Sequence, residues 1–440
     1  MPQNQFRKNV LRLALPVTLQ SVLQSSFSLV DQVMVGQLGS VEIAAIGLAG
    51  KFFSIYTVMV AAVSTVAGIL MAQAVGAEDA GSRDRSFRNN LLLALVLGLG
   101  FMTPCVLFPR KIMVLYATDR RTVAAAAAYL RILSLSCLPL AASSLLATLL
   151  RCLEKASLPL YAGIASVAVN TGFNYVLIFG KLGLPALGVE GAALASALSQ
   201  FANLAVMLVL FRRCTGGLRL RWNVPGRQDW GAYGSVLLPL LATELLWSLG
   251  ENVYGIIYGH LGTEPCAAMT LLNPIQSLVI GALSGLSQAA GILVGKELGA
   301  GKPEAASADA SRVLRYGLAG SAALSCLLLV LGRFYLELFR VEAAVQTVAW
   351  QIMLVYAAIS PVKVQNMILG GVLRSGGKTS LVLWIDLCGT WVFGVPLGLL
   401  AAFVLGWSIP WVYLLLSLEE CVRLTLGLTV FHRKTWIQKL

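Results

Sequence analysis

Six carboxylic acids lie within long apolar stretches of this 440-residue chain. A charged side chain at the centre of a lipid bilayer costs about 3 kcal/mol even on the gentlest scale, so six unpaired ones facing lipid are too costly to be incidental. We therefore expect these groups to be protonated, paired or turned toward a wet cavity, where they could hold a cation. They are Asp31, Glu244, Glu251, Asp386, Glu419 and Glu420.

Polar side chains recur at helical spacing around the first of these groups. One stripe consists of Gln20, Ser21, Gln24, Ser28 and Asp31. Shifting the chain by 223 residues places this stripe over a second one, which consists of Thr243, Glu244, Trp247, Glu251 and Tyr254. We expect both stripes to face one cavity, whereas the structural alternative is hydrogen bonding between packed helices.

Other polar groups leave two interpretations open. Glu419 and Arg423 are spaced i,i+4, so they could neutralise each other within one helix. A gating or structural role is assigned to Asp386, Glu419 and Glu420. For Asp386, near the cytoplasmic end of its apolar stretch, ion binding is the alternative. Asn170 and Asn174 share a helix face and could either complete a network around Asp31 or bridge helices. The basic residues inside apolar stretches are Lys51, Arg131, Lys363 and Arg423.

The 223-residue shift extends far beyond the stripes. It superposes Pro16 on Pro239, Gly36 on Gly259, the tetrapeptide 67–70 on 290–293, and Arg151 on Arg374. Because the register holds over more than a hundred residues, the chain consists of two copies of one unit. Repeats of this kind are common in membrane transporters.

The composition indicates that lipid is the solvent of each copy. Hydrophobic residues make up 58% and charged residues 12% of the chain, far from the roughly 45–50% and 25% of soluble domains. Continuous apolar runs predict membrane helices rather than a barrel. The expected spans are 10–36, 42–74, 88–108, 122–148, 157–180, 188–211, 232–259, 265–297, 311–332, 344–372, 379–404 and 407–431.

The predicted fold is an all-α membrane protein with twelve transmembrane helices in two pseudo-symmetric six-helix lobes around a central cleft. An even number of spans per copy inserts both copies in the same orientation. The expected organisation is an N-lobe at 1–212, a linker at 213–230 and a C-lobe at 231–440. Most lysines and arginines fall in the loops on the side of the N-terminus, which predicts cytoplasmic termini in a cell membrane.

Several chemistries are excluded by their missing partners. The segment 371–379, GVLRSGGKT, differs from a phosphate-binding loop in its glycine spacing and follows a helix rather than a strand. His260 and His432 have no ligand partners at metal-binding spacing, and the eight cysteines suggest no disulfide framework. We expect no catalytic residues, no metal, no cofactor, no nucleic-acid partner, and function as a monomer.

Several segments resemble the multidrug and toxic compound extrusion (MATE) transporters. They include LRCLEKA, LRSGGKTS and ATELLWSLGENVYGIIYGHLG, and the resemblance covers nearly the whole chain. It implies twelve helices in two lobes, export of organic compounds and coupling to inward sodium or proton flow. By this resemblance, Asp31 matches the N-lobe coupling carboxylate, with Asn170 and Asn174 as its partners.

The chain departs from the family pattern at two positions. Asn174 stands where a proton-coupled branch has a second aspartate, and Trp247 stands where a sodium-coupled branch has a glutamate. Neither branch therefore fixes the coupling ion as Na⁺ or H⁺.

The resulting hypothesis is an antiporter that exports small organic, cationic and amphipathic compounds by alternating access. The coupling ion is assigned to Asp31, Asn170, Asn174, Glu244 and Glu251, and the substrate to Gln24, Ser28, Glu244, Trp247, Glu251 and Tyr254. The alternatives are a lipid-linked saccharide flippase, which would want arginines rather than acids in its cleft, and a channel.

Overall fold

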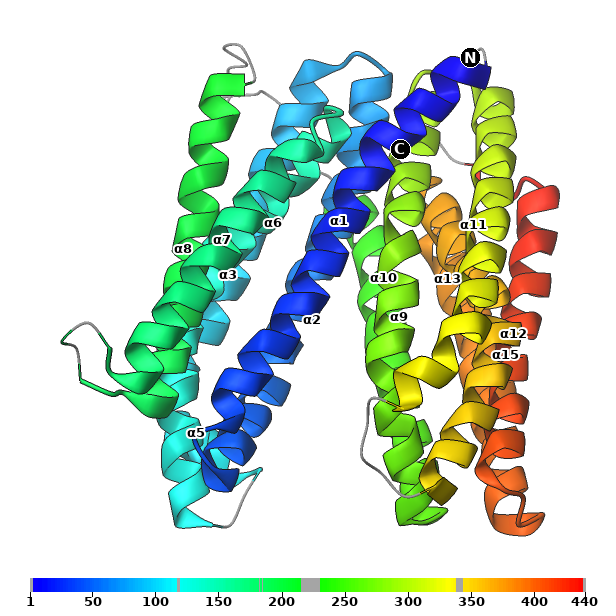
Figure 1. The fold of residues 1–440 in the computed structure, drawn as a ribbon. Helices are drawn as coiled ribbons and strands as arrows, with labels where there is room; N and C mark the ends of the chain where they lie inside the picture. The colour runs from blue at the N-terminus through cyan, green and yellow to red at the C-terminus, as the bar shows by residue number, and fades with distance from the viewer. Residues whose placement is uncertain are drawn as a thin grey trace. The chain divides into compact units, whose positions relative to one another are not determined.

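The computed structural model describes residues 3–116, 119–181, 183, 185–214, 230–337 and 343–437. Throughout these residues the regular structure is helical (Figure 1). In the first half lie α1 (Gln3–Gly36), α2 (Ser40–Gly76), α3 (Ala80–Leu107), α4 (Pro109–Val114), α5 (Arg120–Leu133), η1 (Ser134–Ser136), α6 (Cys137–Cys152), α7 (Ser157–Phe179) and α8 (Gly188–Cys214). In the second half lie α9 (Trp230–His260), α10 (Thr263–Gly299), α11 (Pro303–Glu337), α12 (Ala343–Ser375), α13 (Thr379–Asp386), η2 (Leu387–Gly394), α14 (Val395–Leu399), η3 (Leu400–Val404) and α15 (Ile409–His432).

The chain divides into two compact units. Unit 1 contains Met1–Thr18, Gly76–Glu78 and Arg227–Leu440, and unit 2 contains Leu19–Val75 and Asp79–Gly226. The beginning of α1 thus packs with the second half of the chain: the Thr18 hydroxyl donates to the carbonyl of Ala282 at 3.0 Å. The linker predicted at 213–230 lies almost entirely outside the described residues, and the lobe boundaries stay predictions.

Ten described helical stretches are long and apolar enough to cross a bilayer. The first of them begins at Val41 and the last ends at Val404, and their bounds follow the predicted spans closely. Helices α1 and α15, with 34 and 24 residues, have sufficient length but are not among these ten. The membrane-spanning helical class is therefore confirmed, whereas the count of twelve stays a prediction.

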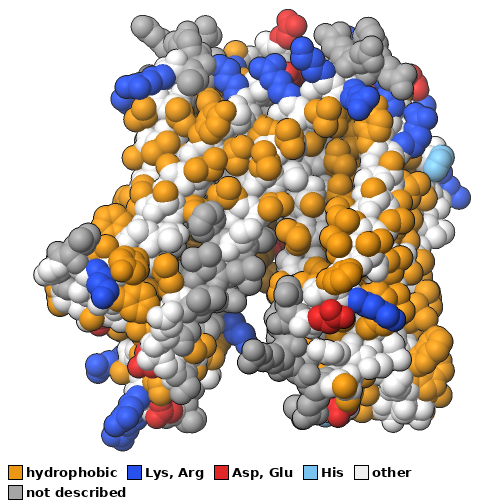
Figure 2. All heavy atoms as spheres, in the orientation of Figure 1, with side chains coloured by type: hydrophobic (Ala, Val, Ile, Leu, Met, Phe, Trp, Pro, Cys, Tyr) orange, Lys and Arg blue, Asp and Glu red, His pale blue; other side chains and the backbone are white. Residues whose placement is uncertain are grey.

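The outer surfaces of these helices suit lipid rather than water. On α11, for example, Val330 and Phe334 are 65% and 66% exposed. On the face shown in Figure 2, hydrophobic side chains cover the middle of the helices, and lysines and arginines gather near helix ends. This distribution is the one expected of helices whose centres contact hydrocarbon.

The two copies repeat their internal contacts as well as their sequence. In unit 2 the Ser64 hydroxyl contacts Ser144 at 2.7 Å, and in unit 1 the residue 223 positions later, Ser287, donates to the carbonyl of Met367 at 2.7 Å. One turn further, Gly68 packs against Thr148, and Gly291 packs in the same way against Gly371. The duplication therefore preserves the packing of the second helix of each copy on the fourth.

The segment from Thr379 to Val404 departs from regular α-helix. Two π-helical stretches, η2 and η3, flank the short helix α14, which begins next to Pro396. A π-helix is rare and often marks a functional site because it shifts the following side chains around the helix axis. Here η2 packs against α15 and α9, which supply most of the charged groups described next.

Candidate functional site in unit 1

Unit 1 contains a partly open polar cavity of about 280 Å³ between α9, α10, α12 and α15. Its lining combines three glutamates with one lysine, two amides and three tyrosines. The lining residues are Glu251, Tyr254, Gly255, Tyr258, Met269, Asn273, Gln276, Lys363, Tyr413, Leu416, Ser417, Glu419 and Glu420. We call this space the acidic cavity.

The face that α9 turns to the cavity follows directly from helical periodicity. Glu251, Tyr254, Gly255 and Tyr258 are spaced by three and four residues, so they stack on one side of the helix. Glu251 and Tyr254 of the predicted stripe therefore belong to the lining of this cavity, whereas a single cavity faced by both stripes stays a prediction. Gly255 leaves open space beside these side chains.

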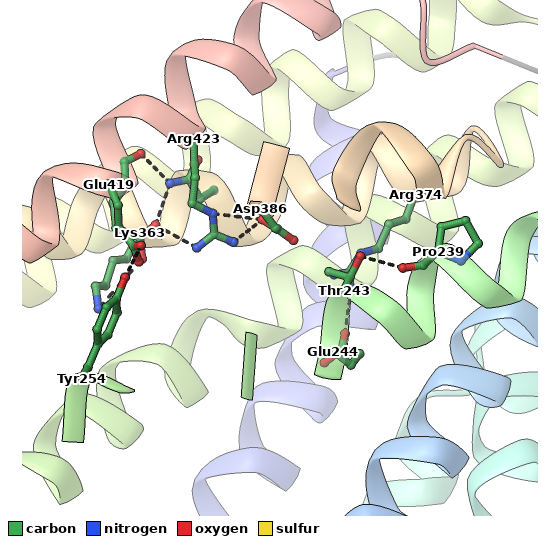
Figure 3. Close-up of polar contacts among 11 residues, drawn as sticks. Pro239, Thr243, Glu244, Tyr254, Lys363, Arg374, Asp386, Glu419 and Arg423 are labelled. Atoms are coloured by element: carbon green, nitrogen blue, oxygen red, sulfur yellow. Dashed lines mark hydrogen bonds and ion pairs between the residues drawn. The ribbon is translucent and has the colours of Figure 1, made fainter. Parts of the chain in front are cut away.

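A hydrogen bond ties α9 to α15 at the cavity wall. The Tyr254 hydroxyl donates to the carboxylate of Glu419, and both residues are buried (Figure 3). Gly394, in η2, packs directly against this pair, where no Cβ atom would fit. The π-helical segment therefore packs directly against the hydrogen bond between Tyr254 and Glu419.

Arg423 joins two helices through two carboxylates. Its guanidinium donates to Asp386 from Nε at 2.9 Å and also through Nη2, and its Nη1 lies 3.5 Å from Glu420 (Figure 3). Glu419 accepts a hydrogen bond from Tyr254, and its neutralisation by Arg423 stays a prediction. Asp386, at the end of α13, offers Arg423 a geometry with two donors on one oxygen.

Glu420 is the most connected acid of the cavity. Its Oε2 accepts from Asn366 Nδ2 at 2.7 Å, and its Oε1 lies 3.9 Å from Nζ of Lys363. Buried charges are tolerated only when they are paired and hydrogen-bonded, and Glu420 meets both conditions. Together with Asp386, the cavity acids outnumber the two neighbouring cations, Lys363 and Arg423, so the region favours a further positive charge when all are ionised.

Glu244 and Trp247 lie outside the acidic cavity, although they belong to the same predicted stripe. Glu244 pairs with Arg374 at 3.4 Å, and the neighbouring Thr243 hydroxyl donates back to the Pro239 carbonyl (Figure 3). Trp247 is 50% exposed. The stripe is longer than the cavity, so its two ends reach different surroundings.

In unit 2 the predicted residues make contacts between helices. Asn174 Nδ2 donates to Asn170 Oδ1 at 3.1 Å, and Asn170 lies 3.5 Å from the Ser196 hydroxyl on α8. Gln20 accepts from Arg151 at 3.0 Å, and Gln24 is exposed. The asparagines therefore bridge α7 and α8. The side chains of Ser28 and Asp31 lie outside the described residues, so an additional link to Asp31 stays a prediction.

Several cavity residues were absent from the sequence-based assignment. Lys363 was identified as a cation inside an apolar stretch but was given no role, while Asn273, Gln276 and Tyr413 were not singled out. Their common signal is a polar atom within a predicted span, and Gln276 indeed donates to the Tyr413 hydroxyl at 3.3 Å. Within the described part of the chain, no group of three or more His, Cys, Asp or Glu side chains could hold a metal ion.

These features define a helical, multi-pass membrane protein built from a duplicated unit, with a charged cavity inside one unit. Comparison with known families agrees. The sequence profile of the MatE family matches twice, at residues 16–176 and 239–400, so each match begins at the equivalent proline of one copy. The chain belongs to the MatE family of multidrug and toxic compound extrusion transporters.

Individual relatives are distant but cover the chain. The "Probable multidrug resistance protein NorM" of Rhizobium meliloti is 29% identical over 90% of this chain and 87% of its own length. Its namesake in Mesorhizobium japonicum is 26% identical over 98% and 96%. Among solved structures, an outward-facing multidrug resistance MATE family transporter of the MOP superfamily has a TM-score of 0.88 at 18% identity, covering 98% of this chain and 96% of that one. A MOP superfamily transporter from Pyrococcus furiosus has a TM-score of 0.86 at 18% identity, with the same coverage.

Proposed function

We propose that this protein is a secondary active antiporter of the cell membrane, which exports organic, cationic and amphipathic compounds in exchange for inward Na⁺ or H⁺. The observation that carries the proposal is the acidic cavity, in which carboxylates outnumber cations inside a membrane-spanning unit. Relatives named as multidrug resistance proteins support the substrate class. One chain suffices, since every residue of the cavity comes from one unit.

The proposed mechanism is alternating access. A cation arriving from outside neutralises a carboxylate, which changes the stability of one conformation relative to the other, and the organic substrate leaves as the protein opens outward. One charge moving through 100 mV supplies about 2.3 kcal/mol. Since 1.4 kcal/mol is a factor of ten, this energy supports roughly a fiftyfold concentration ratio.

We assign coupling to Asp31 in unit 2 and to Glu251 in unit 1. Glu251 lines the cavity and, among the described residues, has no hydrogen-bond or ion-pair partner that would hold it in one state. We assign Asp31 to coupling because it belongs to the polar stripe of α1 and because it matches the coupling carboxylate of the family by resemblance. Of the other residues assigned from the sequence, Tyr254 contributes to the cavity wall, whereas Glu244 is held by Arg374.

The decisive experiment measures efflux of a fluorescent organic cation from proteoliposomes under sodium and proton gradients imposed separately. We expect one of the two gradients to drive uphill export. Asp31→Asn and Glu251→Gln should each lower gradient-driven export at least tenfold, whereas Glu264→Gln, at the exposed start of α10, should not. Equal flux with and without a gradient would indicate a channel and overturn the antiport proposal.

A further inference from the structure

Four basic side chains lie close together in the chain where α3 leads through α4 into α5. Arg110 and Lys111 belong to α4, and Arg120 and Arg121 form the start of α5. All four are exposed, and we call them the basic cluster. In the predicted topology this segment faces outward, whereas the loop lysines and arginines of membrane proteins concentrate on the cytoplasmic side. The basic cluster therefore does not serve to orient the chain in the membrane.

The second copy shows that the scaffold does not need these charges. A shift of 223 residues places Arg110 on Arg333, which lies over the ring of Trp350 at 5.0 Å from its centre. The counterparts of the other three cations are uncharged: Phe334, Ala343 and Ala344. Since the same helices form in the second copy without them, the three additional cations of the first copy are available to a partner.

Within the protein the basic cluster is only partly neutralised. The one acid of this segment, Asp119, caps α5 by accepting from the backbone N–H and the hydroxyl of Thr122, at 2.8 and 2.7 Å. Its charge also attracts the neighbouring Arg121. Lys111 lies with its Nζ 5.2 Å from the centre of the Phe108 ring. In the described part of the chain none of the four cations forms a salt bridge, so the segment keeps an excess of positive charge.

Exposed apolar side chains accompany these cations. Leu107 and Leu115 are 62% and 83% exposed, and the second value is the highest of any large hydrophobic side chain among the described residues. The segment is nevertheless fixed to unit 2. Met113 is buried, and the ring of Tyr116 packs edge-on against Phe52 of α2 with 6.0 Å between the ring centres. The structure thus presents cations and apolar groups together on one ordered segment.

The level of this segment in the membrane follows from the length of the helix before it. At about 1.5 Å per residue, the apolar stretch 91–109 is as long as the hydrocarbon core is thick. Arg110 and Lys111 follow directly and therefore lie at the level of the lipid headgroups. Guanidinium and ammonium groups there donate to phosphates, and the adjoining apolar side chains insert toward the acyl chains.

We propose that α4 and the start of α5 bind anionic phospholipids of the outer leaflet. The basic cluster contacts the headgroup phosphates, while Leu107 and Leu115 contact the glycerol and acyl region. A soluble acidic protein would complement the cations but would leave the apolar side chains at the hydrocarbon boundary unused. This inference concerns the lipid surroundings of the first copy and does not depend on the transported substrate.

The test measures which lipid lies next to this segment. In a background lacking the eight native cysteines, Leu107→Cys carries a thiol-reactive fluorophore, and the full-length protein is reconstituted in phosphatidylcholine vesicles with a minor fraction of phosphatidylglycerol. Two otherwise identical preparations place a nitroxide quencher on the acyl chain of one lipid or the other. Val330→Cys is the matched control, because Val330 occupies the equivalent position of the second copy and is 65% exposed.

Quenching by labelled phosphatidylglycerol should indicate a local fraction at Leu107→Cys at least about fivefold higher than at Val330→Cys. One lysine or arginine near an anionic surface already contributes about that factor. Raising the salt concentration should lower the enrichment, since the charges are exposed. Quenching by labelled phosphatidylcholine should be similar at both positions.

Charge variants identify the groups responsible. The combined variant Lys111→Gln, Arg120→Gln and Arg121→Gln removes the cations that the second copy lacks, and it should lower the enrichment at Leu107→Cys to the level at Val330→Cys. Exchanging the same residues as Lys111→Arg, Arg120→Lys and Arg121→Lys keeps the charges and should preserve it. Unchanged quenching at Val330→Cys in both combined variants shows that the protein is folded and inserted.

Two results would overturn the proposal. Equal enrichment of phosphatidylglycerol at Leu107→Cys and Val330→Cys would exclude a lipid site specific to the first copy and leave an acidic protein as the remaining partner for the basic cluster. An enrichment that persists in the combined glutamine variant would show that these cations do not hold the lipid.

Discussion

At the residue scale, the hydroxyl of Tyr254 and the carboxylate of Glu419 form the contact that joins α9 to α15 beside the acidic cavity. Removing the hydroxyl in Tyr254→Phe leaves a buried carboxylate with one donor fewer. Hydrogen bonds to charged groups contribute roughly 1.5–3 kcal/mol, so we expect a loss of about 2 kcal/mol and a lower Tm in detergent. Tyr161→Phe, which removes a hydroxyl from an exposed tyrosine on α7, serves as control. An unchanged Tm for Tyr254→Phe would show that the contact adds no stability.

Arg423 permits a second test, because it is paired with both Asp386 and Glu420. Arg423→Met leaves these two carboxylates without their shared cation, and breaking a buried pair in this way costs about 3–5 kcal/mol. Adding Asp386→Asn removes one of the stranded charges, so the double variant should be more stable than Arg423→Met alone. Thermal unfolding of the two single variants and the double variant measures this coupling; additive losses would contradict it.

The sequence predicted part of this site, for a definable reason. Spacing along one helix identifies Glu251 and Tyr254 as neighbours, because periodicity fixes which side chains share a face. It does not identify Lys363 or Asn273 as residues that line the same cavity, since these come from α12 and α10 and meet α9 only after packing. For the same reason, the pairing of Arg423 with Asp386 could not be derived from the spacing within α15.

At the element scale, two glycines of the π-helical segment η2 allow it to pack closely against side chains of α9 and α15. Gly394 packs against Tyr254 and Glu419, and Gly389 packs against the stem of Arg423, without room for a Cβ atom at either position. Gly394→Ala should displace the Tyr254 hydroxyl from Glu419 and lower the Tm by an amount similar to Tyr254→Phe. The two changes should not add when combined, because they remove the same contact. Gly259→Ala on α9, where a Cβ atom meets open space, is the control.

The helices themselves were more predictable than this segment. The expected spans 42–74 and 157–180 correspond to α2 (Ser40–Gly76) and α7 (Ser157–Phe179), because apolar runs bounded by polar residues decide where membrane helices end. The π-helical stretch η2 packs against α15 and α9, and η3 packs against α15. Such contacts are long-range, and hydropathy along the chain contains no signal for them.

The loop before α3 gives a pH-dependent prediction. Asp79 caps this helix, accepting from the Ser82 amide at 2.9 Å, and hydrogen bonds from the Ser82 side chain and backbone lower the pKa of the carboxyl. A lowered pKa means that Asp79 stabilises the fold fully above its unfolded pKa of about 3.9, and loses this contribution as the pH falls through its folded pKa. Asp79→Asn keeps a capping side chain but cannot ionise.

We therefore expect the wild type to exceed Asp79→Asn in stability at pH 7 by roughly 0.3–1 kcal/mol, the usual effect of a negative charge at a helix N-terminus. This difference should shrink as the pH falls below about 3.9 and disappear below the folded pKa of Asp79. Asp79→Ala, which also loses the cap, should be less stable than the wild type by about 1 kcal/mol at pH 7. The measurement is Tm against pH for the three proteins, and a difference between wild type and Asp79→Asn that does not change with pH would contradict it.

At the scale of the whole molecule, the two copies keep one scaffold but place their charges differently. Arg151 and Arg374 occupy equivalent positions and each reaches the first helix of its own copy, yet Arg151 meets the neutral Gln20 and Arg374 meets Glu244. Likewise, the cavity acid Glu251 corresponds to Ser28 in the first copy. Duplication thus supplied the framework, and later divergence concentrated ionisable groups in unit 1. The simplest interpretation of this asymmetry is that the two copies have different roles in transport.

The duplicated framework also predicts a topology that can be measured directly. With both copies inserted in the same orientation, the turn between α2 and α3 faces the cytoplasm and the turn before α15 faces outward. In a background lacking the eight native cysteines, Ala77→Cys and Ser408→Cys place single thiols at these exposed positions. A membrane-impermeant maleimide should label Ser408→Cys in intact cells, but should label Ala77→Cys only after permeabilisation. The reverse pattern would invert the assigned orientation, and labelling of both positions from outside would contradict an odd number of crossings between them, which the twelve-span arrangement requires.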